Sequence, residues 1–469
     1  MNEPHEIDGI RTLKRNFPEI TQILGALQTY RGQPHTEGLD KKADKRLDKK
    51  GAKVLTLFMP STRKYANSHH WLTFKMGDLV NRLGAHGWLN LGASFSKCEY
   101  LLRAPIAPRM ASKLGQIYMR RGAWATAQIE GNPLSQEQFN ASLDEKGKFP
   151  KSQQYSVMEI SNVISALKAL ESEIAVRKAS RLAVSQVFEV TPEWIKGMNK
   201  QLLAGLKLEE YVIPGQYRTY DVGVNTYKGA PHQDLEYLME EFCKWFNSLM
   251  KDSNDAARGG DPLLGFATTF IAAALAHLYF AWIHPFGDGN GRTARLIECA
   301  ILANSDLVPW ISTNILSDYY NKTRDSYYER LEAASANSDV VGFVNYSIRG
   351  FLEQVGEQVI EVQKFQRQIS WISYIHEQFS KSPANVKSRR QKVLSLHLQE
   401  EIPVTIKDLL TNEHLIIKTI YSTLSVKTLK RDLEELNAMG LVYSIDGKTY
   451  QANIRIMDGF NPLPELGSH

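Results

Sequence analysis

HPFGDGNGRTAR, residues 284–295, joins two apolar stretches and combines a histidine, an acid, three glycines and an asparagine with two arginines. The stretch before it, residues 262–283, contains no Asp, Glu, Lys or Arg. Because Pro285 and the glycines after it disfavour a continuous helix, the pattern predicts a helix that ends near His284 and a second that begins near Gly291. The loop between them therefore lies at a helix N-terminus, where unpaired backbone N–H groups attract anions.

The side chains of this loop suit phosphate chemistry. Glycines let the main chain approach a phosphate closely, and Arg292 and Arg295 are spaced so that both reach bound phosphates. Asp288 is a hard oxygen donor suited to Mg²⁺ carried by those phosphates, and His284 is placed to take a proton from a hydroxyl. The glycine spacing differs from a dinucleotide-binding fingerprint, and no predicted strand precedes it. A plain helix–turn–helix corner is the alternative interpretation.

Composition places the chain among globular proteins of more than one domain. Its 469 residues exceed an ordinary domain, and 43% hydrophobic with 23% charged residues allow a substantial core. The net charge of +5 is compatible with an anionic ligand without indicating a nucleic-acid binder. The three cysteines are far apart and form neither a disulfide framework nor a zinc motif, so we expect a reducing, cytoplasmic location.

The apolar stretch 262–283 has about the length of the ~20 residues that span a bilayer. It is rich in Ala and Thr, contains His277 and has no bias of basic residues at its flanks. A helix that is apolar all round is either a membrane span or the central helix of a large fold. We expect the central helix, and no membrane partner.

The rest of the chain predicts a mainly α-helical protein with one hairpin in its main domain. Residues 1–53 resemble a solvated linker, and alternation with several glycines in residues 215–231 predicts a β-hairpin. Near the C-terminus a capped helix over 425–440 precedes two short strands, an order typical of a winged helix. The expected regions are an N-terminal region 1–103, a core 104–381, a winged helix 382–456 and a tail 457–469.

The opening stretch resembles the signature of the Fic family, HPFx(D/E)GNGRxxR, at every defined position, and the resemblance extends from about residue 71 to residue 365. It implies a helical core with a hairpin flap, and transfer of AMP from ATP to a Ser, Thr or Tyr hydroxyl of a target protein with release of pyrophosphate. His284 would be the general base, and Asp288 would hold Mg²⁺. The kinase-like Doc branch typically has Lys where Gly291 stands. The implied ATP-binding residues are Gly287, Asp288, Gly289, Asn290, Gly291, Arg292, Arg295, Tyr327 and Tyr328.

A second stretch, TAQIEGNP at residues 126–133, is similar to the family's inhibitory pattern (S/T)xxxE(G/N). Thr126 and Glu130 would lie on one face of an inhibitory helix near 112–130, in the class II arrangement. In the family this glutamate pairs with the second signature arginine, here Arg295, and excludes the ATP γ-phosphate. Some such enzymes also remove AMP with the same glutamate, and the sequence leaves the balance between the two reactions open.

The predicted hairpin aligns with the family's flap, which pairs with the target backbone as an added strand. Ser335 stands where the family often has an asparagine near adenine. The candidate target-binding residues of the flap are Asp221, Val222, Gly223 and Val224.

Partners beyond the target protein stay open at this level. Residues 425–450 include a helix that opens with Lys427, Lys430 and Arg431, and such a helix binds DNA, forms dimers or docks targets in winged helices. A homodimer and self-modification are both compatible with the pattern. The alternative functions are a nucleotide-sensing DNA-binding regulator and a transferase of another nucleotide or of phosphocholine.

Overall fold

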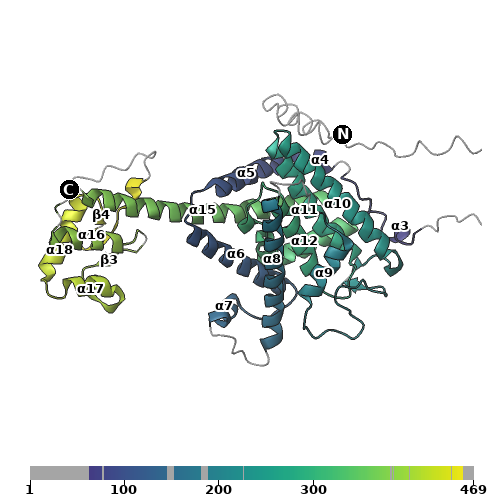
Figure 1. Ribbon diagram of the computed structural model, residues 1–469, viewed down its shortest axis with the longest axis horizontal. Helices are drawn as coiled ribbons and strands as arrows, with labels where there is room; N and C mark the ends of the chain where they lie inside the picture. The colour runs from purple at the N-terminus through teal and green to yellow at the C-terminus, as the bar shows by residue number, and fades with distance from the viewer. Residues whose placement is uncertain are drawn as a thin grey trace, which may run out of the picture. The chain divides into compact units, whose positions relative to one another are not determined.

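The computed structural model describes residues 63–457, apart from short gaps at 77–78, 145–152, 181–188, 225–226, 381–382, 384, 401 and 445. The predicted linker 1–53 and nearly all of the tail 457–469 lie outside the described residues. Two compact units divide between Gln358 and Val359, and Figure 1 labels their elements.

The first unit is built around α11 (Pro262–Ile283), which packs against both α10 (Leu235–Arg258) and α12 (Asn290–Asn304). Pro262 opens α11, and the Asp261 carboxylate accepts a hydrogen bond from the Leu264 N–H at 2.9 Å. In the described part of the chain, α11 is the helix long and apolar enough to cross a membrane, and 89% of its 18-residue apolar window is buried in the protein. The absence of charged residues from α11 therefore reflects its burial in the core.

Further helices surround this centre, and most begin and end as their caps and prolines indicate. In Figure 1, α6 and α8 lie beside the central helices, and contacts of α12 with both agree with that view. Their bounds are α3 (Tyr65–Ser68), α4 (Leu79–Arg82), α5 (Gly84–Arg103), α6 (Pro108–Ile129), α7 (Gln136–Asp144), α8 (Gln154–Ser180), α9 (Pro192–Leu202), η2 (His232–Asp234), η3 (Trp310–Ser312), α13 (Ile315–Lys322), α14 (Arg324–Ala336) and α15 (Val340–Ser380).

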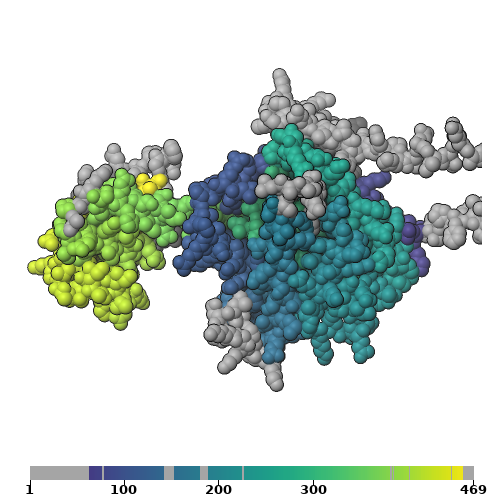
Figure 2. All heavy atoms as spheres, viewed as in Figure 1, coloured from purple at the N-terminus to yellow at the C-terminus, as the bar shows by residue number. Residues whose placement is uncertain are grey.

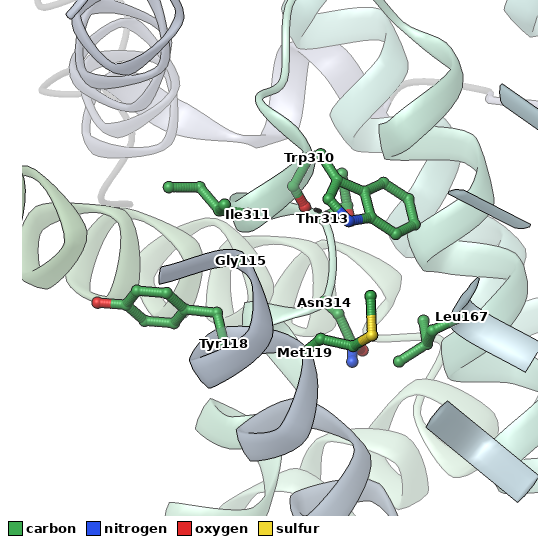
Figure 3. Close-up of a pocket in the computed structure, with 8 residues that line it drawn as sticks. All are labelled: Gly115, Tyr118, Met119, Leu167, Trp310, Ile311, Thr313 and Asn314. Carbon is green, nitrogen blue, oxygen red and sulfur yellow. Dashed lines mark hydrogen bonds between the residues drawn. The ribbon is translucent and has the colours of Figure 1, made fainter. Parts of the chain in front are cut away.

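Helix α6, which corresponds to the helix predicted near 112–130, is packed tightly on its inner side. A Cβ atom on Gly122 would overlap the Asn314 side chain, so this glycine lets α6 approach the segment before α13. In Figure 2 the dark blue atoms of residues 84–129 border the lighter blue atoms of α8. A small cavity shown in Figure 3 lies between α6, α8, η3 and α13, and its lining residues are Gly115, Tyr118, Met119, Leu167, Trp310, Ile311, Thr313 and Asn314.

The predicted hairpin is present as β1 (Gly223–Val224) and β2 (Tyr227–Lys228). The strands are antiparallel, with Gly223 opposite Lys228 and Val224 opposite Tyr227. The short alternating pattern in the sequence thus predicted the hairpin correctly.

The second unit has its own apolar core and a three-stranded antiparallel sheet in the order β3-β5-β4. Ser425 caps α18, whose leucines 429, 433 and 436 are buried as the sequence predicts. Helix, strand, helix, helix, strand and strand follow one another, and the winged helix stays a prediction. The bounds are α16 (Val386–His397), β3 (Val404–Thr405), η4 (Asp408–Leu410), η5 (Asn412–His414), α17 (Leu415–Tyr421), α18 (Val426–Ala438), β4 (Val442–Ser444), β5 (Thr449–Ala452) and η6 (Ile454–Met457).

The division between the units lies earlier than the boundary expected after residue 381. Helix α15 continues from Val340 to Ser380, and Trp371, Ile375 and Phe379 near its end belong to the core of the second unit. A continuous helix carries no cap or breaker at the point where its buried face changes from one core to the other. The boundary expected near residue 382 instead corresponds to the end of α15.

Candidate active site

His284 closes α11 and carries a neutral imidazole. Its backbone is left-handed at φ 50° and ψ 58°, and its N–H donates to the Phe280 carbonyl at 2.9 Å. Burial lowers the pKa of His284 to about 4, because the charged form loses solvation. Its Nδ1 lies 3.3 Å from the Ala281 carbonyl oxygen. Since a carbonyl only accepts, this contact assigns the proton to Nδ1 and leaves Nε2 as a proton acceptor.

The loop after His284 is shaped by glycines and by an asparagine that bonds back to it. A Cβ atom on Gly287 would overlap the Tyr220 hydroxyl, and Gly289 adopts φ 76°. The Asn290 side chain accepts from the Phe286 N–H at 2.9 Å and donates to the Phe286 carbonyl at 2.8 Å. The amide of Asn290 therefore fixes the loop, while its main chain opens α12, where N–H groups face an incoming anion.

Two buried side chains outside the signature hold this loop from behind. Asn199 on α9 donates to the Asp288 carbonyl at 3.0 Å and accepts from the Gly215 N–H at 3.0 Å. Arg218 donates to the carbonyls of His284 at 2.8 Å and Tyr220 at 2.7 Å, and also to that of Ala230. Burial lowers the pKa of Arg218. Sequence analysis missed both residues, because a lone arginine or asparagine outside a motif carries no signal.

Arg295 is enclosed by the residues of the second sequence pattern. Its Nε donates to Thr126 Oγ1 at 2.5 Å, and its Nη2 lies 2.5 Å from Glu130 Oε1. Its Nη1 lies 3.4 Å from the Tyr327 hydroxyl. Burial opposes ionisation of Glu130, but the Arg295 charge outweighs it and holds the pKa of Glu130 below its usual range. Every nitrogen of the Arg295 guanidinium thus has a partner.

Glu130 itself lies one residue beyond α6, at its C-cap, rather than in the last helical turn as the sequence suggested. Gly131 follows with φ 95° and ends the helix. A Cβ atom on Gly291 would overlap Glu130 Oε1, so the carboxylate lies directly over the first turn of α12. The structure therefore brings together Thr126, Glu130 and Arg295, the three residues that the resemblance connects.

Arg292, the first signature arginine, lies between two carboxylates. Its Nη2 is 2.9 Å from Asp288 Oδ1, and its Nη1 is 2.5 Å from Glu159 Oε1 on α8. Its buried Nε has no hydrogen-bond partner in the described part of the chain. Glu159 was not selected from the sequence, where it is one glutamate among several in a helical stretch.

Asp288 fits a magnesium ion that arrives with phosphates. Its carboxylate is 39% exposed, and Oδ1 faces Arg292. Among the described residues, no group of three His, Cys, Asp or Glu side chains is arranged to hold a metal. Mg²⁺ commonly takes one or two carboxylates and fills its octahedron with phosphate and water oxygens, which suits a single carboxylate at this loop.

A cavity of about 560 Å³ lies between the flap, the segment before α4 and helix α14. Its volume is in the usual range for small-molecule sites. Ser335, which stands where the family often has an asparagine, lines it. The lining residues are Ser68, His69, Trp71, Asp221, Val222, Tyr227, Lys228, Gly229, Pro231, Glu332, Ser335 and Ala336.

The predicted tyrosine pair contacts the segment around Glu130. The Tyr328 hydroxyl donates to the Ile129 carbonyl at 3.1 Å. Tyr327 is buried, and its hydroxyl lies 2.8 Å from His277 Nε2 in addition to its contact with Arg295. In this structure the pair therefore supports the end of α6 and the second arginine.

The basic side chains of α18 are interleaved with acids. Lys430 lies 3.7 Å from Glu434, and Arg431 lies 4.0 Å from Glu435. Glu435 also pairs with Lys387 of α16 at 2.6 Å. These pairs reduce the positive charge that a DNA-binding helix would present to phosphates.

Part of the chain is similar to a known protein family. Residues 189–302 match the model described as the Fic/DOC family. The chain is similar to the protein adenylyltransferase Fic of Nematostella vectensis, with 28% identity over 221 residues, 47% of this chain and 44% of that protein. It is also similar to the protein adenylyltransferase fic-1 of Caenorhabditis briggsae, with 29% identity over 222 residues, 47% of this chain and 37% of that protein. The chain spans less than half the length of these curated relatives.

Two solved structures resemble the chain. A Fic family protein from Desulfovibrio desulfuricans G20 is 19% identical, with a TM-score of 0.45 over 78% of this chain and 95% of that one. Residues 134–508 of Fic-1 from Caenorhabditis elegans are 22% identical, with a TM-score of 0.46 over 59% of this chain and 72% of that one.

Proposed function

We propose that this chain is an autoinhibited protein adenylyltransferase. It transfers AMP from ATP to a Ser, Thr or Tyr hydroxyl of a target protein and releases pyrophosphate. The observation that carries the proposal is a histidine whose Nδ1 contacts a carbonyl, which leaves Nε2 to accept a proton, at the end of the glycine loop that opens α12 and carries two buried arginines. The match to the Fic/DOC family and the names of the relatives support the same activity.

In the proposed reaction, His284 Nε2 removes the proton from the target hydroxyl. The hydroxyl oxygen forms a bond to the α-phosphorus of ATP, and the bond from that phosphorus to the leaving oxygen of pyrophosphate breaks. The N–H groups at the start of α12 stabilise charge on the α-phosphate, and Arg292 and Arg295 neutralise the distal phosphates. Mg²⁺ held by Asp288 would neutralise further phosphate charge.

Recognition of the substrates would fall to the surfaces around the loop. The cavity between the flap and α14 is large enough for a nucleoside, and His69 and Trp71 offer aromatic faces at its wall. The flap would pair with the target backbone through β1. Asp221, at the base of the flap, is engaged by His232, whose Nδ1 lies 2.9 Å from Asp221 Oδ1. This pairing would fix the flap's orientation.

Autoinhibition follows from the pairing of Arg295. The Glu130 carboxylate contacts its guanidinium at 2.5 Å, and the negative charge of Glu130 offsets the positive charge of Arg295. Arg295 therefore attracts a phosphate less than a free arginine would. Because the nitrogens of Arg295 are fully engaged, the γ-phosphate would have to displace the Glu130 carboxylate.

The test compares auto-labelling of wild type, Glu130→Gly and Glu130→Gly/His284→Ala with labelled ATP and Mg²⁺. We expect low labelling in wild type, at least about tenfold more in Glu130→Gly, the factor equivalent to ~1.4 kcal/mol, and background in the double variant. Equal labelling of wild type and Glu130→Gly would contradict autoinhibition. Labelling that survives His284→Ala would contradict its role as the base.

The acceptor of the nucleotide needs a separate measurement. Incubation of a cell lysate with Glu130→Gly and tagged ATP, followed by mass spectrometry, is expected to find AMP on hydroxyl side chains. Parallel reactions with tagged GTP, CTP and UTP test the choice of nucleotide. Incubation of the modified target with wild-type enzyme tests AMP removal, for which Glu130 is the residue placed to orient water.

A further inference from the structure

The two signature arginines differ in how their nitrogens are occupied. Arg295 has partners on Nε, Nη1 and Nη2, including Glu130. Arg292 has partners on Nη1 and Nη2, while its buried Nε has none in the described part of the chain. An unpaired buried N–H is costly, so the Nε edge of Arg292 is a donor without its acceptor. Arg292 is held in place and still has bonding capacity, whereas Arg295 is blocked.

Glu159 contacts Arg292 through Nη1, the guanidinium nitrogen that does not contact Asp288. Glu159 is 6% exposed, and both of its carboxylate oxygens are engaged. Oε1 accepts from Arg292, and Oε2 accepts from Asn132 Nδ2 at 2.8 Å. Asn132 also donates to the Ser156 carbonyl at 2.9 Å, one turn earlier on α8. Glu159 is therefore fixed by a second buried side chain before it meets the arginine.

The other partner of Arg292 is Asp288, and it is the carboxylate suited to Mg²⁺. An Asp288 oxygen that coordinates a metal is a weaker acceptor for a guanidinium, since the cation draws on the same lone pairs. With metal and nucleotide bound, Glu159 would be the remaining protein carboxylate on Arg292. A planar guanidinium fixed at one edge loses less conformational freedom when its other edge binds phosphate.

We propose that Glu159 is a positioning residue for the nucleotide, which anchors Arg292 so that its Nε edge faces the bound phosphates. The proposal rests on the proposed function, because it assigns Arg292 to phosphate binding. Glu159 does not block the arginine as Glu130 blocks Arg295. Its removal is expected to weaken ATP binding rather than to activate the enzyme.

The experiment uses the full chain in the Glu130→Gly background, with Glu159→Gln as the variant. Glutamine keeps the size of the side chain, but it removes the charge and cannot accept from both Arg292 and Asn132. We expect the Kd for ATP with Mg²⁺, measured by calorimetry, and the KM for ATP to rise about tenfold, the equivalent of ~1.4 kcal/mol. The kcat is expected to fall by less than about threefold, because a loss of uniform binding leaves kcat largely unchanged. Glu171→Gln is the matched control, an exposed glutamate on the same helix.

A double-mutant cycle separates positioning from general structural support. In the Arg292→Ala background, Glu159→Gln is expected to change the Kd for ATP by less than about twofold, because the arginine through which it acts is gone. An equal loss of affinity with and without Arg292 would overturn the proposal, as would an unchanged Kd when Arg292 is present. If the Glu130→Gly protein itself binds no ATP, both the proposed function and the role of Glu159 are contradicted. If the Glu130→Gly protein binds ATP and transfers AMP, the result for Glu159→Gln tests the role of Glu159 alone.

Discussion

At the scale of single residues, the site is defined by the way in which burial and pairing set charge. Loss of solvation lowers the pKa of His284 to about 4, and the Arg295 charge lowers the pKa of Glu130. In the proposed function, the first shift keeps a base available at neutral pH. The second shift keeps a negative charge on Glu130 for the proposed inhibitory contact. Both are properties of the surroundings that the bare residue types do not reveal.

The lowered pKa of His284 gives a prediction for the pH dependence of Glu130→Gly. The active form is the neutral imidazole, and a pKa of about 4 keeps it neutral well below the ordinary value of 6.5. We therefore expect kcat/KM to stay within about twofold between about pH 8 and pH 6, measured by initial rates of labelling. A decline of about tenfold per pH unit starting near 6.5 would show that the imidazole titrates as an unburied histidine.

The signature residues could be predicted from the sequence because their spacing is dense and specific. The partner Glu130 could be predicted through its own short pattern. Arg218, Asn199 and Glu159 could not, because each acts through a contact between segments distant in the sequence. Their residue types are ordinary in helices and loops, and their function comes from burial, which only the fold defines.

At the scale of elements, the proposed inhibitory contact joins the end of α6 to the start of α12. The carboxylate of Glu130 lies over Gly291, in space that any larger residue at that position would need. The two helix ends are fixed by separate packing, α6 against α13 and α12 against α11. The contact of Glu130 with the start of α12 therefore depends on the short distance between the ends of these two helices.

Gly291→Ala tests this contact without changing a charge. The added methyl group must displace the Glu130 carboxylate, and alanine itself favours helix over glycine. We expect auto-labelling between that of wild type and that of Glu130→Gly. As a control, Gly291→Ala in the Glu130→Gly background, where no carboxylate is left to displace, is expected to raise labelling no further. A rate equal to wild type would contradict the crowding argument.

The connection between the flap and the loop depends on Arg218. Replacing it by methionine, which has a similar length, removes donors from the carbonyls of His284, Tyr220 and Ala230. Each unpaired buried acceptor costs about 1–3 kcal/mol, so we expect the free energy of unfolding in urea to fall by at least about 2 kcal/mol. Arg109→Met, at an exposed site on α6, is expected to change it by less than about 0.5 kcal/mol. Equal stability of the two variants would contradict the assigned role of Arg218.

At the scale of the whole molecule, one helix, α15, contributes residues to both hydrophobic cores. The first core uses α15 up to Val355, and the second uses it from Trp371. The mainly helical character could be predicted from periodicity. The dividing point could not, because the hydrophobic pattern continues along α15 without a breaker between Val340 and Ser380.

This sharing predicts how truncated chains behave. A chain that ends at Ser380 keeps Trp371, Ile375 and Phe379 but lacks the residues of the second unit that cover them. A chain that ends at Lys364 lacks these three side chains as well as the residues that cover them. We expect the longer fragment to self-associate more, because it exposes a large apolar patch. Light scattering of the two fragments at equal concentration checks this. Equal scattering by the two fragments would show that these three side chains are not part of a separate core.

The crowding over Gly291 also limits how such a protein can change through mutation. A large side chain at that position and the Glu130 carboxylate in its present place require the same space, so the two are incompatible in one molecule. A lineage that acquires a bulky residue there must lose the glutamate, or its contact, first or at the same step. The order of substitutions is therefore constrained, and among descendants of this fold a large residue at 291 should be found together with a missing glutamate at 130.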